Sequence, residues 1–309
     1  VCYMEQHELE KEQQHLQETI DIIRKQLDQA AAESAKNAAA IRAIQEERME
    51  SNRMDVGGMY STQGFADILE LSQGTLEITQ MKQAQDETGQ AMRTLVKMED
   101  NPYFARIDFR FDEGGTKPIY IGRATLMEKD SLQIHVYDWR VPIASVFYQY
   151  GMGPAEYEAP AGIIKGEVLL KSQYEIQHGK LCYFFDANEE VRDAFLRDLL
   201  SGSAAPAMKS IVETIQRDQD TNIRDMKAGV LMVKARAGSG KTSVALHRVA
   251  SLMYPGLPKG RLSPNDILIL APNATFYRYI SRVLPAIGEQ QVQTMLAKEL
   301  LCGLLSSTY

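Results

Sequence analysis

The hydrophobic positions of the first hundred residues recur every three or four residues over long stretches. From Leu9 onward, the apolar or small side chains of this pattern are Leu16, Ile20, Ile23, Leu27, Ala30, Ser34, Asn37, Ile41 and Ile44. Alternating steps of four and three form the seam of a coiled coil, and no proline precedes Pro102 to interrupt a helix. The pattern stops around Asp55–Gly58 and resumes less regularly from Phe65 to Leu95. We therefore predict an antiparallel coiled-coil arm over residues 1–99, with its tip near residues 54–64.

Residues 100–186 follow a period of two instead. Apolar and polar side chains alternate in short runs, a pattern that is typical of half-buried strands. The apolar positions are Ile107, Phe109, Phe111, Leu132, Ile134, Val136, Val168, Leu170, Tyr174, Ile176, Leu181, Tyr183 and Phe185. Gly114–Gly115 and His178–Gly179 supply turn residues. The pattern predicts an antiparallel β-meander with Trp139, the only tryptophan, in its core and with Asp138 paired to Arg140.

Residues 187–309 alternate helical and strand-like segments. We expect helices over Glu189–Leu200 and Met208–Met226. The uniformly apolar run Gly229–Val233 indicates a buried parallel strand, and a second one is expected at Ile267–Asn273. Between them a Gly-rich segment leads into a helix that begins near Lys241. The whole chain is thus expected to be α+β followed by the first part of a parallel α/β domain, incomplete at its C-terminus.

The Gly-rich segment has the form of a phosphate-binding P-loop, Ala235–Thr242, although alanine replaces the first glycine of the usual pattern. Gly238 and Gly240 let the backbone curl so that its amides point at phosphates, and the start of the following helix adds free amides. Lys241 would neutralise the β- and γ-phosphates of ATP, and the Thr242 hydroxyl would hold Mg²⁺. The predicted cradle comprises Ala237, Gly238, Ser239, Gly240, Lys241, Thr242 and Ser243, with Lys241 and Thr242 as the catalytic pair and Thr242 as the metal ligand.

Hydrolysis of ATP also needs an acidic residue on a later strand, where it holds Mg²⁺ and polarises water. No such segment occurs before Tyr309. We therefore expect a fragment of a longer protein that carries the nucleotide cradle without the hydrolytic half. Such a fragment would bind ATP weakly and would be inactive alone as an ATPase.

Charge separates the predicted arm from the rest of the chain. Residues 1–100 carry 19 acidic and 10 basic side chains, whereas residues 101–309 carry 22 acidic and 24 basic ones. An acidic arm is a poor DNA binder because phosphates repel it. Two interpretations stay open, a solvated coiled-coil surface and an arm that fits a basic groove or channel of a partner.

The cysteines and the hydropathy profile point to the cytoplasm. Cys2, Cys182 and Cys302 lie far apart, so no pair has metal-ligand or redox spacing. The N-terminal segment is polar, and no apolar run is long enough to span a membrane. We therefore predict a cytoplasmic protein without membrane contact.

The P-loop followed by Ser243–Arg248 resembles that of the UvrD/Rep-like superfamily 1 helicases. More narrowly, the chain resembles the helicase D family of bacterial RNA polymerase-associated ATPases over about residues 100–285. The stretches that carry this resemblance are Tyr103–Phe109, Val136–Ile143, Gly153–Gly162 and Met208–Val212. The P-loop alone is generic, whereas the Asp138–Arg140 and Gly153–Tyr157 stretches are specific to the family.

The resemblance implies a RecA-like motor domain and an N-terminal arm that enters the secondary channel of RNA polymerase. It further implies that the factor strips nucleic acid from stalled polymerase and uses ATP in its own release and recycling. Within the stretch Ile215–Gln219, the resemblance assigns Gln219 to the adenine base. The predicted tip, Met54–Tyr60, contains a single acidic residue, so it departs from a densely acidic tip that would reach the polymerase metal.

Two other function classes remain as alternatives. A conventional ATP-dependent DNA helicase or translocase of DNA repair would have its glutamine motif within a few residues of the N-terminus, whereas about two hundred residues precede it here. Coiled-coil chromosome or repair ATPases place their coiled coil after the P-loop, whereas here it comes first. Both features favour the polymerase-bound factor, with DNA as a possible further partner of the full-length motor.

Overall fold

The computed structural model describes residues 6–51, 62–128, 130–186, 212, 215–226, 229–236, 238–254, 262–286 and 292–306. The chain forms two compact units. One comprises residues 1–102 together with 177–180, and the other comprises residues 103–176 and 181–309.

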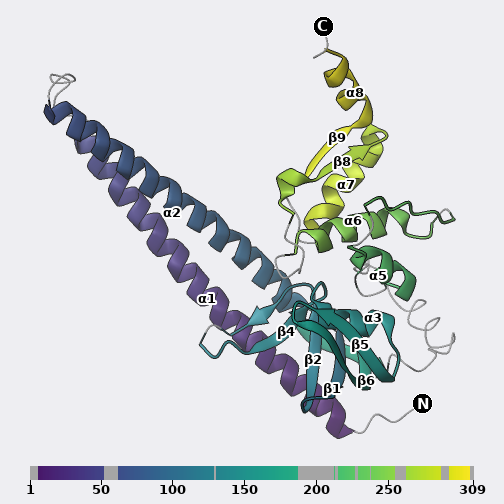
Figure 1. Ribbon diagram of the computed structural model, residues 1–309. Coiled ribbons are helices and arrows are strands. Elements are labelled where there is room, and N and C mark those ends of the chain that lie inside the picture. Colours follow the sequence, from purple (N-terminus) through teal and green to yellow (C-terminus); the bar gives the residue numbers. More distant parts are fainter. Residues whose placement is uncertain are drawn as a thin grey trace. The chain divides into compact units, whose positions relative to one another are not determined.

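The first unit consists mainly of two long helices, α1 (Gln6–Ser51) and α2 (Thr62–Asp100), which lie side by side (Figure 1). The expectation of two long helices is therefore confirmed. The buried face of α1 follows the expected spacing, because Leu16, Ile20, Ile23, Ala30 and Ile41 are at most 8% exposed. An ion pair of 2.7 Å between Arg24 and Glu99 joins the two helices. The expected tip residues Met54–Tyr60 lie outside the described residues.

The second unit begins with a seven-stranded mixed sheet whose order is β3-β4-β2-β1-β6-β5, with β7 paired to β6. Its strands are β1 (Ala105–Phe111), β2 (Thr116–Gly122), β3 (Leu126–Met127), β4 (Ile134–Asp138), β5 (Gly153–Ala159), β6 (Gly162–Gln177) and β7 (Lys180–Asp186). Between β4 and β5 the chain forms a short 3-10 helix, η1 (Pro142–Ala144), and helix α3 (Ser145–Gln149).

The expected antiparallel meander is wrong in two respects. The strand β4 pairs with β2 in parallel, with Ile121 opposite Tyr137, because the chain first crosses through β3. The strand β1 has β6 as its second neighbour, a pairing of distant segments that no local pattern signals. Leu132 was expected on a strand, but it lies in a turn with φ of 56° and is 68% exposed.

Side chains that alternate along the strands form the core of this unit. Ile107, Phe109 and Val168 are at most 1% exposed and belong to one cluster with Trp139, which is also 1% exposed. The expected pairing of Asp138 with Arg140 is present, with two hydrogen bonds of 2.9 and 2.7 Å between their side chains. The interpretation of Trp139 as a core residue is therefore confirmed.

The remaining elements of the second unit are short. They are α5 (Arg217–Arg224), α6 (Lys241–Leu252), η3 (Pro264–Asp266), β8 (Leu268–Ala271), α7 (Ala274–Ala286), β9 (Gln293–Leu296) and α8 (Ala297–Ser306). The strand β8 lies within the second strand expected from the sequence and pairs in parallel with β9. It is buried only in part, because Leu268 and Leu270 are 43% and 45% exposed.

Two further expectations for this region are wrong, and one cannot be compared. The run Gly229–Val233 is not a strand, and Val230 and Met232 are 89% and 73% exposed. A strand needs a hydrogen-bonding neighbour, and among the described residues β8 pairs with β9 instead. A single helix over Met208–Met226 is also wrong, because Gln216 is extended and only Arg217–Arg224 is helical near its end. The helix expected at Glu189–Leu200 lies outside the described residues.

No helix in the described part of the chain combines the length and apolar character that a membrane span requires.

Candidate functional site

Helix α5 begins with a reciprocal cap that positions Gln219. Gln216 precedes the helix in an extended conformation, with φ of −81° and ψ of 159°. Its main-chain N–H donates to Gln219 Oε1 over 3.1 Å, and its own side chain caps the main chain of Gln219. These bonds satisfy groups that a helix start leaves unpaired, so the helix begins at Arg217. The predicted adenine contact therefore lies in the first turn of α5.

The predicted phosphate loop ends where α6 starts, at Lys241, as the sequence indicated. Gly238 and Gly240 have φ of 81° and 79°, in the left-handed region that favours glycine. Gly240 caps α6, and its carbonyl accepts the N–H of Val244 over 2.9 Å. Ala237 lies outside the described residues. The backbone thus turns sharply before the helix, as a phosphate cradle requires.

Gln219 lies beside this loop, although 20 residues separate it from Ser239 in the sequence. Its Nε2 donates to the main-chain oxygen of Ser239 over 3.4 Å. A β-carbon at Gly240 would also come within 3.4 Å of Nε2. A glutamine amide can donate two hydrogen bonds and accept two, so one of each remains after the bonds to Gln216 and Ser239. That pair of groups matches the edge of an adenine base.

Lys241 extends its ammonium group back over the loop. Its Nζ donates to the carbonyl oxygens of Ala235 and Arg236 over 3.0 and 2.7 Å. Carbonyl dipoles are weaker partners for an ammonium group than phosphate oxygens, so an arriving anion could replace them. Thr242 and Ser243 follow in the first turn of α6, and both are half-buried.

His247 is a residue of this region that sequence reasoning missed. It is 1% exposed, and its Nδ1 lies 2.7 Å from the main-chain oxygen of Ser243. Its ring meets Trp139 edge to face, with 5.6 Å between the centroids. Burial lowers the pKa of His247, while the bond to the Ser243 oxygen opposes that shift. The spacing of four residues between Ser243 and His247 on a helix was the only available signal.

A cleft of about 530 Å³ lies beside α5 and is separate from the predicted nucleotide site. Thr221 and Arg224 of α5 line it together with Gln149 and Tyr157. None of the predicted nucleotide-binding residues lines it, so the cleft does not mark the predicted site.

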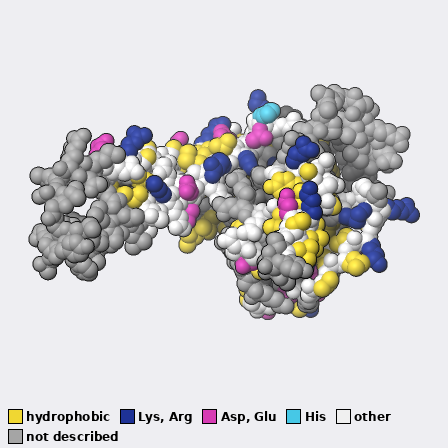
Figure 2. Space-filling view, turned by 90° about the horizontal axis from the view of Figure 1, so that it is seen from above, with side chains coloured by type: hydrophobic (Ala, Val, Ile, Leu, Met, Phe, Trp, Pro, Cys, Tyr) yellow, Lys and Arg dark blue, Asp and Glu magenta, His cyan; other side chains and the backbone are white. Residues whose placement is uncertain are grey.

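The exposed surface of the long helices offers a second candidate for binding. In the view of Figure 2, basic and acidic side chains are interspersed over the long helices. The acidic side chains Asp28, Glu33 and Glu46 of α1 are exposed. The net negative charge of this segment is therefore spread along the helix rather than gathered in one cluster.

One comparison with known proteins finds a family that matches the part of the chain with the two long helices and the seven-stranded sheet. Residues 9–198 match the family described as DNA helicase IV HelD, N-terminal domain. A comparison with curated proteins gives no match. The matched region contains most of α1 and all of α2 and the strands β1 to β7, and it ends before α5 and the predicted phosphate loop. The match spans more than half of the residues of this chain, so the chain belongs to the HelD N-terminal domain family of DNA helicase IV.

Proposed function

We propose that this chain holds ATP with Mg²⁺ as part of a helicase-like ATPase that binds RNA polymerase through α1 and α2. In this proposal ATP serves the release and recycling of stalled transcription complexes. The observation that carries the nucleotide part is the 3.4 Å bond between the Gln219 amide and the Ser239 carbonyl. Through this bond Gln219, whose amide can recognise a nucleotide base, lies next to the loop that we propose binds the phosphates.

The residues of the loop fit a nucleotide-bound cation better than a free metal. No group of three or more His, Cys, Asp or Glu side chains in the described part of the chain could hold a metal. Thr242 can offer a single hydroxyl, and Mg²⁺ commonly completes its shell with water and phosphate oxygens. The bound cation would neutralise charge on the triphosphate. The protein contributes the main-chain amides of Gly238–Lys241, the Lys241 ammonium and the positive end of α6.

The two long helices suit a role in reaching into a partner. Helix α1 has 46 residues and is therefore about 70 Å long at a rise of 1.5 Å per residue. A pair of helices buries little surface compared with the surface that it exposes. We therefore propose that its length serves to reach into a partner more than to stabilise the fold. Residues 1–100 carry 19 acidic and 10 basic side chains, which favours a basic channel as the docking surface. The secondary channel of RNA polymerase is the partner surface that the family resemblance implies.

Charge substitutions on α1 test the arm. The triple variant Asp28→Asn, Glu33→Gln, Glu46→Gln removes three exposed negative charges and keeps the side-chain shapes. We expect the full-length protein with these changes to associate more slowly with purified RNA polymerase and to show a weaker salt dependence. The control Asp112→Asn, Glu113→Gln, Glu158→Gln removes the same charge from exposed positions near the sheet. Equal association rates for both triple variants and the wild type would refute the role of the arm.

A conventional DNA helicase is the second candidate, and the family description favours it because it names a DNA helicase. The two candidates differ in their substrates. Strand separation of a DNA duplex by the full-length protein without polymerase, lost in Lys241→Ala, would support the helicase. Release of stalled polymerase complexes without strand separation would support the first candidate.

A further inference from the structure

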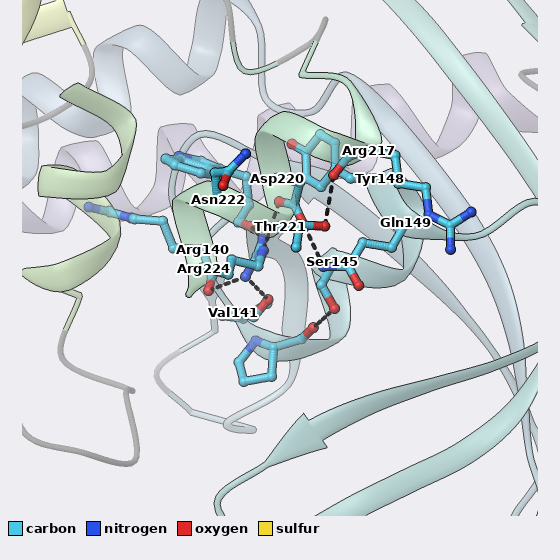
Figure 3. A network of polar contacts seen from close by, with 12 residues as sticks. Arg140, Val141, Ser145, Tyr148, Gln149, Arg217, Asp220, Thr221, Asn222 and Arg224 are labelled. Atoms are coloured by element: carbon cyan, nitrogen blue, oxygen red, sulfur yellow. Dashed lines mark hydrogen bonds and ion pairs between the residues drawn. The ribbon is translucent and has the colours of Figure 1, made fainter. Parts of the chain in front are cut away.

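Three consecutive residues, Trp139–Val141, make their main-chain oxygens available to a single side chain of α5. Arg224 donates from Nη1 to the oxygens of Arg140 and Val141, over 3.0 and 3.3 Å, and from Nη2 to the oxygen of Trp139. Figure 3 shows the guanidinium group pointing from α5 towards this segment. A planar guanidinium has five N–H groups in a fixed fork, so it can hold several carbonyls at once in one geometry.

The charge of Arg224 is balanced inside the same network. Its Nε donates to Asp220 Oδ1 over 2.8 Å, and the other oxygen of Asp220 accepts from Gln149 of α3 over 2.7 Å. Asp220 is 0% exposed, and the Arg224 side chain is 15% exposed. Buried charged groups are held firmly when their hydrogen bonds are satisfied. The network therefore fixes α5 against the segment that follows β4.

Two residues of this segment also contact the region of α6. The Trp139 ring meets His247, and the Arg140 guanidinium lies 5.1 Å from the centre of the Tyr254 ring, just beyond the end of α6. Gln219 is adjacent to Asp220 on α5, and Lys241 begins α6. One segment thus contacts both helices that carry the two ends of the proposed nucleotide site.

Helix α5 needs such support because it has only eight residues. An isolated helix of this length is unstable, so tertiary contacts decide where it lies. The hydrogen bond from Gln219 to Ser239 is long, at 3.4 Å, and cannot hold the helix by itself.

We infer that Trp139–Val141, acting through Arg224, is a positioning element that sets Gln219 against the phosphate loop. This inference rests on the proposed binding of ATP. Arg224 is a positioning residue, because it touches neither the base nor the phosphates in this arrangement. Its loss displaces Gln219, so base recognition weakens while the loop still holds phosphates.

The test compares three ligands, ATP, GTP and inorganic tripolyphosphate, whose dissociation constants are measured on the full chain. For Arg224→Gln we expect the preference for ATP over GTP to fall by about five- to tenfold, the size of one or more lost hydrogen bonds. The affinity for tripolyphosphate should stay within about twofold of the wild type, because the loop is unchanged. Gln219→Ala should give the same pattern, whereas Lys241→Ala should weaken ATP and tripolyphosphate together.

Two further variants separate positioning from unfolding. Arg224→Lys keeps a positive charge beside Asp220 but lacks the fork, so it should lower the ATP preference in the same direction and by less. Arg110→Gln makes the same change as Arg224→Gln at a 56% exposed side chain that pairs with Glu167, and it should leave all three affinities unchanged. Thermal unfolding of each variant shows whether binding was measured on folded protein.

A reduced ATP preference with intact tripolyphosphate binding supports the inference. An unchanged preference for ATP over GTP in folded Arg224→Gln or Arg224→Lys overturns the inference. An equal loss of affinity for all three ligands overturns it as well. In both cases the proposed function still stands. If the wild type binds neither ATP nor tripolyphosphate, the proposed function fails, and the inference fails with it.

Discussion

The Nδ1 atom of His247 lies 2.7 Å from the main-chain oxygen of Ser243, one helical turn earlier in α6. Because a carbonyl oxygen only accepts, Nδ1 carries the proton in the neutral ring, and Nε2 is left unprotonated. Nε2 is buried and finds no hydrogen-bond partner among the described residues. A second proton on this ring would therefore place an unpaired charge in the core, next to Trp139.

This arrangement predicts a pH dependence of stability. The pKa of His247 is lowered in the folded state by burial, whereas in the unfolded chain it returns to about 6.5. Unfolding therefore takes up a proton below pH of about 6.5, so the stability present above that pH is lost as the pH falls. For one proton the free energy of unfolding falls by at most about 1.4 kcal/mol per pH unit.

Urea unfolding at pH 7.5, 6.5 and 5.5, followed by the fluorescence of Trp139, measures this effect. His247→Phe keeps an aromatic ring beside Trp139 but cannot be protonated, so its stability should fall less between pH 6.5 and 5.5. His7→Gln, which replaces an exposed histidine of α1, should keep the slope of the wild type. A slope in His247→Phe equal to that of the wild type would contradict the burial of a neutral imidazole.

Removing the loop lysine should weaken ATP binding and leave the fold intact. The Lys241 ammonium group donates to the exposed loop carbonyls of Ala235 and Arg236. Lys241→Ala should therefore change the free energy of unfolding by less than about 0.5 kcal/mol. The loss of charge-assisted bonds to phosphates should lower the ATP affinity of the full-length protein by about 10- to 100-fold. Equal affinities in calorimetric titrations would remove the support for a P-loop.

The sheet contains a position where any side chain is excluded. A β-carbon at Gly166 of β6 would lie 2.6 Å from the buried ring of Phe109 and against the main-chain oxygen of Arg110. Gly166→Ala should destabilise the protein by about 1–3 kcal/mol, because the backbone of β1 cannot yield without breaking its pairing. Gly115→Ala is the matched control, since a β-carbon there meets no atom within 4 Å. Similar urea midpoints for the two variants would be incompatible with this packing.

The buried carboxylate of α5 should be among the costliest side chains to remove. Asp220→Ala deprives Arg224 and Gln149 of their shared partner and leaves a largely buried positive charge. We expect a loss of about 3–5 kcal/mol, reduced in part by the bonds that Arg224 keeps to main-chain oxygens. Asp218→Ala, at an exposed position of the same helix, should cost less than about 1 kcal/mol. Chemical unfolding of both variants at neutral pH decides the comparison.

Much of the local structure followed from the order of residues. The spacing from Leu16 to Ile41 predicted the long helix and its buried face, because one helical period repeats without a proline. The glycines of the loop and the start of α6 at Lys241 were equally local, since only the backbone conformation of a few residues is involved. The pairing of Asp138 with Arg140 was also local, because they lie two positions apart in the sequence.

Other features depended on contacts between distant segments. The run Gly229–Val233 has the composition of a strand, but a strand exists only with a paired neighbour, and the sequence does not say where that neighbour lies. The parallel pairing of β2 with β4 depends on the path of the chain through β3. Likewise, only folding brings Gln219 to Ser239 and Arg224 to the oxygens that follow β4. The sequence by itself determined the chemical groups and the short-range conformations of this protein. The tertiary structure alone decided which groups of distant segments meet, because their hydrogen bonds depend on distances that no local pattern encodes.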